Sequence, residues 1–386
     1  MGTISTEAWV LKKAPNGCRE PGALVLEEFT FSEPGPDEVV AEPLLGCWEG
    51  NMTHAIRRDP VDICRQRGED RVVIGNAGVV RVVQTGAAVT SVKEGDICSF
   101  APMGSTDRFG FLETVTAYDA PRTMGLLAKR TKVKESNLLP IPWPTRFSLA
   151  QWAAFSLRYP TAWASWKLAY GCWRQQMTED QLPMPYVWAW GGGVALAELT
   201  LANYFGARTA MASSRPERLA LIEQMGITAI DRRPFDELIF DETRYRTDAP
   251  YRDDYQKAEK TFLGAVKQHT LGLGVSIFFD NIGLPVYRAT LKALGRQGVV
   301  ATVGWKKGMD LHVNRALECI NHHIHVHGHG ARVAEGKAAM AFAEQMGWMP
   351  PISGEACAWE DIPQLADDHS GERLLSYFPM FEINGH

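Results

Sequence analysis

Residues 186–196 of this chain read YVWAWGGGVAL, and this stretch decides its fold. Strand-forming residues run into three glycines, Gly191, Gly192 and Gly193, and an apolar helical pattern begins at Val194. Glycines carry no Cβ, so a backbone built from them can approach a pyrophosphate closely. The start of a helix adds free N–H groups and the positive end of its dipole. We therefore predict that these four residues bind a nucleotide; a tight turn without a ligand is the alternative interpretation.

The residues around this stretch predict a parallel sheet. Residues 186–232 read as strand, glycine turn, helix, strand, helix and short strand, which is a βαβαβ unit. Upstream, Ser148 is expected to cap a helix over 149–159, and a second helical run follows that helix. A charged and aromatic insertion occupies 232–258. The remaining expected elements are strands over 274–283, 298–305 and 323–330, and helices over 255–269, 285–294 and 332–346.

The first part of the chain has a different pattern. Over residues 1–150, short apolar runs alternate with Gly and Pro, which is typical of an irregular, barrel-like β domain. The tail from Ile352 reads as a short helix and a final strand that return to this domain. The predicted fold class is thus α/β plus β. A β domain covers 1–150 with a C-terminal return over 350–386, and a doubly wound nucleotide-binding domain covers 151–349.

The end of the second strand of the βαβαβ unit bears on which nucleotide is bound. NAD sites usually carry an acid there for the ribose hydroxyls. Here the strand ends in Ser213, Ser214 and Arg215, and Arg218 follows one turn later. Hydroxyl and guanidinium groups suit a 2′-phosphate through charge-assisted hydrogen bonds, so we predict NADPH as the cofactor. In the alternative interpretation, Ser213 caps the next helix and the two arginines are solvated.

Composition excludes several classes of protein. The 386 residues contain 40 Lys+Arg and 45 Asp+Glu, for a net charge of −5, so there is no basic footprint for nucleic acid. No apolar run reaches the length of a membrane span, and the first residues show no signal-peptide pattern. The 7 cysteines are scattered without a CxxC pair, which argues against a disulfide framework and zinc lobe. We expect a cytoplasmic protein with no membrane or nucleic-acid partner.

The order of these elements resembles the medium-chain dehydrogenase/reductase superfamily. The matching segments are GNAGVV (75–80), VKEGD (92–96), TAW (161–163), the glycine turn, FDNIG (279–283) and GVV (298–300) leading to Gly304-Trp305. The resemblance implies a GroES-like β-barrel domain, a Rossmann nucleotide-binding domain and an active-site cleft between them. It also implies homodimers joined through the sheet of the nucleotide-binding domain.

The chain departs from the zinc alcohol dehydrogenases of that superfamily, so we expect no metal. Their Gly-His-Glu motif reads Gly75-Asn76-Ala77 here, and Cys47 alone does not make a three-ligand site. Without a Lewis acid, reduction of a conjugated double bond becomes the expected reaction. A Trp-Gly start to the glycine turn, the insertion and the run WEDIP (359–363) are similar to crotonyl-CoA reductase/carboxylase-like enoyl reductases.

The resemblance also indicates site residues. Thr161 is similar to the threonine that contacts the nicotinamide. Asn51 lies in a segment that lines the cleft in relatives, where its amide would hold a ribose or a substrate carbonyl. Tyr159 would protonate an enolate, or it is an inward-facing core tyrosine. The matching segments add further predicted cofactor contacts, which are Asn281, Gly283, Gly304 and Trp305.

Two groups of charged residues have several interpretations. Five histidines cluster between His322 and His329, and on a strand the last four of them, His323, His325, His327 and His329, would project from one face. The interpretations are a strand at a dimer seam, a metal site, or a contact with cofactor or substrate. Arginines between Arg57 and Arg71 would receive an anionic acyl carrier, or they are solvated.

The prediction is an NADPH-dependent enoyl reductase for a small-molecule or carrier-bound acyl substrate. Two alternatives stay open. The first is carbonyl or imine reduction. The second is a nucleotide-binding protein without catalysis, which Ala195 in place of the last glycine of the turn suggests.

Overall fold

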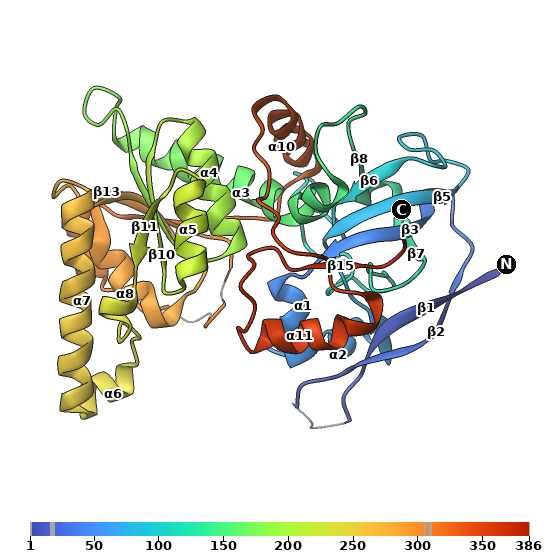
Figure 1. Cartoon of the computed structure of the whole chain (residues 1–386), viewed down its shortest axis with the longest axis horizontal. Coiled ribbons are helices and arrows are strands. Elements are labelled where there is room, and N and C mark those ends of the chain that lie inside the picture. The colour runs from blue at the N-terminus through green and yellow to red at the C-terminus, as the bar shows by residue number, and fades with distance from the viewer. Residues whose placement is uncertain (1, 16–19, 305, 309–310, 386) are drawn as a thin grey trace. The chain divides into compact units, whose positions relative to one another are not determined.

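The computed structural model describes residues 2–15, 20–304, 306–308 and 311–385. The chain divides into two compact units (Figure 1). Unit 1 comprises Met1–Pro160 and Ala331–His386, and unit 2 comprises Thr161–Gly330. Unit 1 includes helix α10 (Val333–Met346), which the sequence analysis assigned to the nucleotide-binding domain. In unit 1, Gly336 of this helix packs against Leu139, and Arg332 lies over the ring of Phe111.

Unit 1 is built on antiparallel sheets. A six-stranded sheet has the order β15-β3-β5-β6-β8 with β7 also paired to β3, and a three-stranded sheet has the order β2-β1-β4. The strand bounds are β1 Thr3–Lys12, β2 Leu24–Ser32, β3 Glu38–Cys47, β4 Arg71–Val73, β5 Gly78–Thr85, β6 Ile97–Phe100, β7 Thr131–Lys134, β8 Leu138–Pro140 and β15 Met380–Glu382. The helices are α1 Gly50–Arg57, α2 Ile63–Arg67, α10 and α11 Ile362–Ser370.

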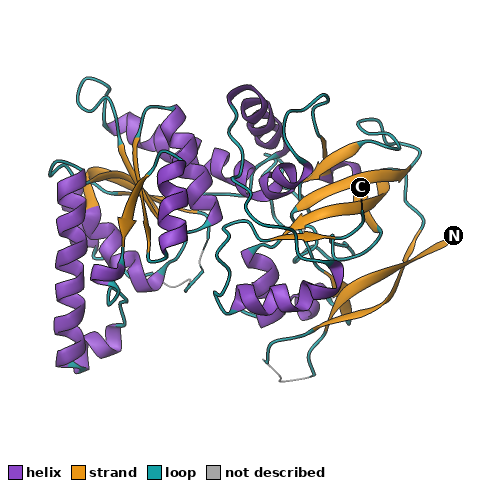
Figure 2. Ribbon diagram, viewed as in Figure 1, coloured by secondary structure: helices purple, strands orange, loops and turns teal. Residues whose placement is uncertain are grey.

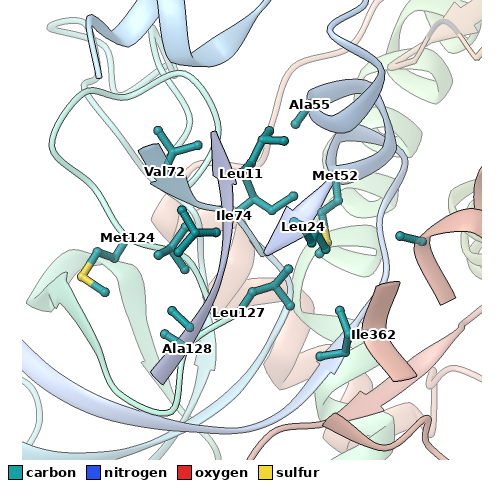
Figure 3. Close-up of a cluster of buried hydrophobic side chains, with 14 of the residues drawn as sticks. Leu11, Leu24, Met52, Ala55, Val72, Ile74, Met124, Leu127, Ala128 and Ile362 are labelled. Carbon is teal, nitrogen blue, oxygen red and sulfur yellow. The ribbon is translucent and has the colours of Figure 1, made fainter. Parts of the chain in front are cut away.

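The predicted return of the C-terminal tail is confirmed. Strand β15 pairs antiparallel with the end of β3, so that Phe381 lies opposite Gly46. Helix α11 adds its apolar side to the same core, where Ile362 lies near Leu127, and Leu11 and Met52 join from β1 and α1 (Figure 3). Because this core draws on both ends of the chain, the tail is an integral part of unit 1.

Unit 2 has helices on both sides of a six-stranded parallel sheet (Figure 2). The strand order is β11-β10-β9-β12-β13-β14, which is a doubly wound arrangement, and the predicted fold class is confirmed. The strand bounds are β9 Tyr186–Trp190, β10 Arg208–Ser213, β11 Thr228–Asp231, β12 Val275–Phe279, β13 Leu294–Thr302 and β14 Ile324–His327. The helices that belong wholly to this unit are α4 Gly193–Tyr204, α5 Pro216–Gln224, α6 Glu242–Thr247, α7 Ala249–His269, α8 Leu284–Ala293 and α9 Arg315–Asn321.

Helix α3 (Leu149–Gln176) runs without interruption through both predicted helical runs. Its start is as predicted, because the Gln151 N–H donates to Oγ of Ser148 at 3.2 Å and the Gln151 side chain accepts from the Ser148 N–H. Pro160 lies inside the helix, at the boundary between the units. The helix continues because residues on both sides of the proline are deeply buried, including Phe155 and Trp166.

Two further observations concern membrane spans and the state of the cysteines. No helix in the described ranges combines the length and apolar character that a bilayer crossing requires. Six of the seven cysteines lie in these ranges, and all six are free thiols.

Candidate functional site

The glycine turn lies at the centre of the carboxyl edge of the unit 2 sheet. Strand β9 is buried throughout and pairs with β10 on one side and β12 on the other, so the turn sits where the strand order reverses. Gly192 has a φ of +150° and caps α4, and Gly193 begins that helix. Among the described residues, no heavy atom lies within 4 Å of the position that a Cβ on Gly192 would occupy. The backbone therefore requires glycine here and leaves open space at the start of α4.

The end of β10 presents hydroxyl and guanidinium groups, as predicted. Ser213 is buried, and its Oγ accepts from the Arg215 N–H at 3.4 Å, while Arg215 caps α5. The hydroxyl of Ser213 thus contributes to the turn before the helix, which the alternative interpretation anticipated. Ser214 and Arg218 are half-buried beside it.

The neighbouring strand brings an acid to the same edge, which the sequence analysis missed. Asp231 ends β11 directly opposite Ser213. Its two carboxylate oxygens both lie 2.9 Å from Nε of Arg233, and this pairing lowers the pKa of Asp231. The carboxylate is thus neutralised by its own neighbour in sequence. The Asp-Arg-Arg run at 231–233, which ends a short predicted strand, was the sequence feature that could have predicted this acid.

Asn281 and Gly283 follow β12 at the same edge. The Asn281 Oδ1 accepts from the Val303 N–H at 2.9 Å, and its backbone oxygen accepts from the Lys306 N–H at 3.1 Å. Gly283 has a φ of +97°, and a Cβ there would lie 2.5 Å from the oxygen of Gly308. Both residues therefore shape the loop after β13. Gly304 packs against Asn281, and the predicted contact Trp305 lies outside the described residues.

Unit 1 holds a buried charged cluster that the sequence analysis did not predict. The Arg158 guanidinium donates to Sγ of Cys47 and to the backbone oxygen of Trp48, each at 2.7 Å. Its Nη1 also lies 3.0 Å from Oε1 of Glu49, and both side chains of this ion pair are over 90% buried. Burial raises the pKa of Cys47 to about 12 and that of Glu49 to about 7, and Arg158 only partly opposes either shift. The thiol is therefore neutral at physiological pH.

Two side-chain amides lie next to this cluster. Asn51 follows Glu49 at the start of α1, and its Oδ1 is buried without a hydrogen bond. Asn76 is 1% exposed, and neither polar atom of its amide makes a hydrogen bond. The chain places Asn76 beside Cys47, because the Cys47 N–H donates to the oxygen of Ala77 at 3.0 Å. Buried amides in this state usually serve a ligand or a bound water.

This donor set does not suit a metal ion. Zinc binding needs a thiolate and further imidazole or carboxylate ligands, whereas Cys47 is a thiol in contact with a guanidinium. Across the described ranges, no group of three or more His, Cys, Asp or Glu side chains is arranged to hold a metal.

The structure brings two of the predicted catalytic residues near the charged cluster. The ion pair between Arg158 and Glu49 holds the segment before Asn51 against the segment of α3 that contains Tyr159. Tyr159 is fully buried, with its ring 4.6 Å from that of Trp348 and 5.1 Å from that of Phe155. Thr161 is half-buried and begins the unit 2 part of the helix. The roles of these residues remain predictions.

The arginines between Arg57 and Arg71 serve the fold of unit 1. The side chain of Arg67 is fully buried, contacts Glu69 through two nitrogens and donates to the oxygen of Thr123 at 2.7 Å. Arg58 pairs with Asp62 and donates to two backbone oxygens. Arg57, Arg65 and Arg71 also make hydrogen bonds within the unit.

The histidines near the edge of the unit 2 sheet form a chain of hydrogen bonds. Oε2 of Glu318 lies 2.9 Å from Nδ1 of His323 and 2.9 Å from Nε2 of His325. The other ring nitrogen of His325 lies 3.0 Å from the hydroxyl of Tyr287. Strand β14 is shorter than predicted, because His322 takes a left-handed conformation that ends α9 and Gly328 follows the strand. The network joins α8, α9 and β14, which favours the structural interpretation.

Comparisons with known proteins agree with this architecture. The sequence matches no protein-family model. It is 25% identical over 232 residues to the "Quinone oxidoreductase-like protein 2 homolog" of Nematostella vectensis, which covers 59% of this chain and 48% of the relative. The chain thus spans about half the length of the curated relative that it matches.

Solved structures resemble the whole chain. The crotonyl-CoA carboxylase/reductase AntE in complex with NADP has a TM-score of 0.80 at 19% identity, covering 99% of this chain and 95% of that one. An NAD-dependent alcohol dehydrogenase has a TM-score of 0.73 at 18% identity, covering 98% of this chain and 100% of that one. The protein AibC has a TM-score of 0.75 at 16% identity, covering 98% and 96%.

These likenesses establish the fold. The chain has the GroES-like and Rossmann architecture of the medium-chain dehydrogenases/reductases, as its sequence motifs indicated.

Proposed function

We propose that this protein is an oxidoreductase of the medium-chain dehydrogenase/reductase type that uses NADPH to reduce an α,β-unsaturated carbonyl compound or thioester. The observation that carries the cofactor assignment is the end of β10. Ser213 and Arg215 stand there without a free acid, because the carboxylate opposite them is held by Arg233. The open space at Gly192 and the start of α4 suit the pyrophosphate. The NADP-bound reductase AntE has the same fold.

The residues of unit 1 support reduction of a conjugated bond. NADPH, when bound, supplies a hydride to the β-carbon, and negative charge then develops on the carbonyl oxygen of the substrate. The Asn76 amide nitrogen is a buried donor with no partner among the described residues, and the chain places Asn76 close to the Cys47–Arg158 contact. A donor of this kind stabilises an oxyanion in a buried setting. The α-carbon takes its proton from water or from Tyr159, which yields the saturated product.

The test is steady-state oxidation of NADPH with crotonyl-CoA and with simple enones, followed by identification of the product. We expect a saturated carbon–carbon bond. An alcohol or amine product instead would show the alternative carbonyl or imine reductase. NADPH binding without turnover of any of these substrates would show the alternative nucleotide-binding protein.

We propose further that the protein forms a homodimer through the sheet of unit 2 and acts in the cytoplasm. Strand β14 is an edge strand, and α9 before it has no buried residue, with Ile320 65% and Leu317 51% exposed. An open strand edge beside exposed apolar residues is a suitable surface for a second copy. Sedimentation velocity tests this state, since a monomer at micromolar concentration would contradict it.

A further inference from the structure

Glu198 is a buried acid and the only charged residue in helix α4, which is mostly apolar. It lies in α4, five residues after Gly193, and is 0% exposed. The flanking residues Ala197 and Leu199 are also fully buried. The proposed mechanism gives Glu198 no role. Packing alone does not call for a carboxyl group here, because an apolar side chain would fill the site at lower cost.

The groups that face Glu198 are neutral. The Ser165 hydroxyl approaches from α3 and the Asn281 amide from the end of β12, and both lower the pKa of Glu198, while burial raises it to about 8 as the dominant effect. No other ionisable group contributes to this shift, and no ion pair within the described ranges includes Glu198. The acid on the same strand end, Asp280, accepts hydrogen bonds from the Thr290 hydroxyl and from the N–H groups of Ile282 and Gly283. Glu198 is therefore a protonated carboxylic acid at neutral pH.

The amide of Asn281 connects this acid to the loop after β13. Oδ1 of Asn281 accepts from the Val303 N–H at 2.9 Å, so Nδ2 of Asn281 faces Glu198. This Nδ2 lies 3.4 Å from Oε2 of Glu198. The acid proton then belongs on Oε1, which is buried without a well-formed hydrogen bond, as is Oγ of Ser165. The backbone oxygen of Asn281 holds the Lys306 N–H on the other side of Gly304.

We infer that Glu198 is a positioning residue whose protonated form, acting through Asn281, holds the loop around Gly304 in the conformation that binds the cofactor. The inference rests on the proposed function, because Gly304 is one of the predicted cofactor contacts. Loss of the proton puts an uncompensated negative charge behind Asn281. Such a charge draws water into the site, which loosens the Asn281 contacts, and it repels an anionic nucleotide bound at the start of α4.

The experiment measures NADPH affinity by intrinsic Trp fluorescence between pH 6.5 and 9.5. We compare the unchanged protein with two variants. Glu198→Gln keeps the shape of the protonated acid but cannot ionise, and Glu223→Gln removes an exposed charge of α5. The affinity of the unchanged protein and of Glu223→Gln falls about fivefold or more as pH rises past 8, whereas that of Glu198→Gln stays level. Parallel pH profiles for Glu198→Gln and the unchanged protein would overturn the inference.

Hydrogen exchange at the amides of Val303 and Lys306, without any cofactor, gives a second readout. After correction for intrinsic rates, protection falls with rising pH in the unchanged protein and stays constant in Glu198→Gln. If NADPH binds to neither protein at any pH, the proposed function fails, and the hydrogen-exchange comparison alone then tests the positioning role. Equal pH dependence of protection in the two proteins would refute that role. If Glu198→Gln does not fold, Asn281→Ser serves instead. It should lose protection at Val303 equally at every pH, and retained pH-dependent protection would refute the link.

Discussion

Arg158 is the residue on which the interior of unit 1 most depends. Its guanidinium donates to Cys47 and Trp48 and lies 3.0 Å from Oε1 of Glu49, and the side chains of the ion pair are 6% and 7% exposed. A buried charge of this kind is tolerable only with its partner, because neither group retains water to replace the other.

We therefore expect Arg158→Ala to lower the free energy of unfolding by about 3–5 kcal/mol, measured by urea denaturation. The double variant Arg158→Met with Glu49→Leu should recover most of that loss, since it removes both charges. Arg246→Ala is the matched control. It breaks the exposed pair with Glu242 and should cost less than about 1 kcal/mol. Equal losses for the two single arginine variants would show that the buried pair has no special importance.

Under the proposed function, we expect Arg215 to set the preference between nucleotides. A charge-assisted contact to a 2′-phosphate is worth about 1.5–3 kcal/mol, so NADPH should bind roughly 10- to 150-fold more tightly than NADH. Arg215→Ala should remove much of that gap and leave NADH binding nearly unchanged, measured by fluorescence titration. Arg208→Ala, at the opposite end of β10, should leave the preference intact. Equal affinity for both nucleotides in the unchanged protein would refute the NADPH assignment.

The places of some candidate site residues in the fold could be predicted from sequence, because their position in a motif identifies them. Ser213 and Arg215 follow a strand in the first βαβ unit, where a parallel sheet gathers its strand ends. Arg158 and Glu198 could not be placed, since their partners Glu49 and Asn281 are distant in sequence. Each does leave a signal, which is a charged residue inside a largely apolar stretch of helix: Arg158 in residues 152–166 of α3, and Glu198 as the charged residue of α4.

Among the elements, the pairing of β3 with β15 closes unit 1. The ring of Phe381 lies across Gly46, and a Cβ at Gly46 would lie 2.1 Å from its Cζ. The absence of a Cβ at Gly46 therefore allows the ring of Phe381 to pack directly on strand β3.

Gly46→Ala should destabilise unit 1 by about 1–3 kcal/mol, because the ring has to move out of a packed core. Thermal unfolding measures this, and adding Phe381→Leu should restore part of the loss. Gly50→Ala, where nothing lies within 4 Å of the new methyl group, should be close to neutral. A neutral Gly46→Ala would mean that the ring has room to shift.

The spacing of apolar residues predicted which helices and strands form the βαβ units, but it did not predict where each one begins and ends. Helix α7 begins at Ala249 instead of 255, because Asp248 caps it by accepting from the Tyr251 N–H, and Pro250 occupies the first turn. That Asp-Ala-Pro start was readable in the sequence. The continuity of α3 through Pro160 was not, since burial by distant segments overrides a local helix breaker.

For the molecule as a whole, buried acids contribute to the pH dependence of stability, and burial raises the pKa of Glu49, Glu198 and Asp280. Burial raises the pKa of Glu49 to about 7 and that of Glu198 to about 8, from an ordinary value of 4.5. Above pH 4.5 the unfolded chain loses these protons first, so unfolding becomes more favourable as pH rises.

The free energy of unfolding should therefore fall between about pH 5 and pH 8 and then level off. Each acid contributes a slope of at most about 1.4 kcal/mol for every tenfold change in proton concentration. Urea denaturation at pH 5, 7 and 9 measures the slope. Glu198→Gln should flatten it for unit 2, and Glu223→Gln should not. A stability that rises steadily from pH 5 to 9 would contradict the expected protonation states.

The division of unit 1 into two stretches of chain has a consequence during synthesis. A ribosome releases unit 2 in full once Gly330 has emerged, whereas the Leu45–Cys47 end of β3 still waits for Met380–Glu382, and the Trp48 N–H for the oxygen of Pro379. At that stage the nascent protein has a complete unit 2, whereas unit 1 still has an open strand edge and an exposed core. Until Met380–Glu382 have emerged, this open edge and exposed core favour aggregation.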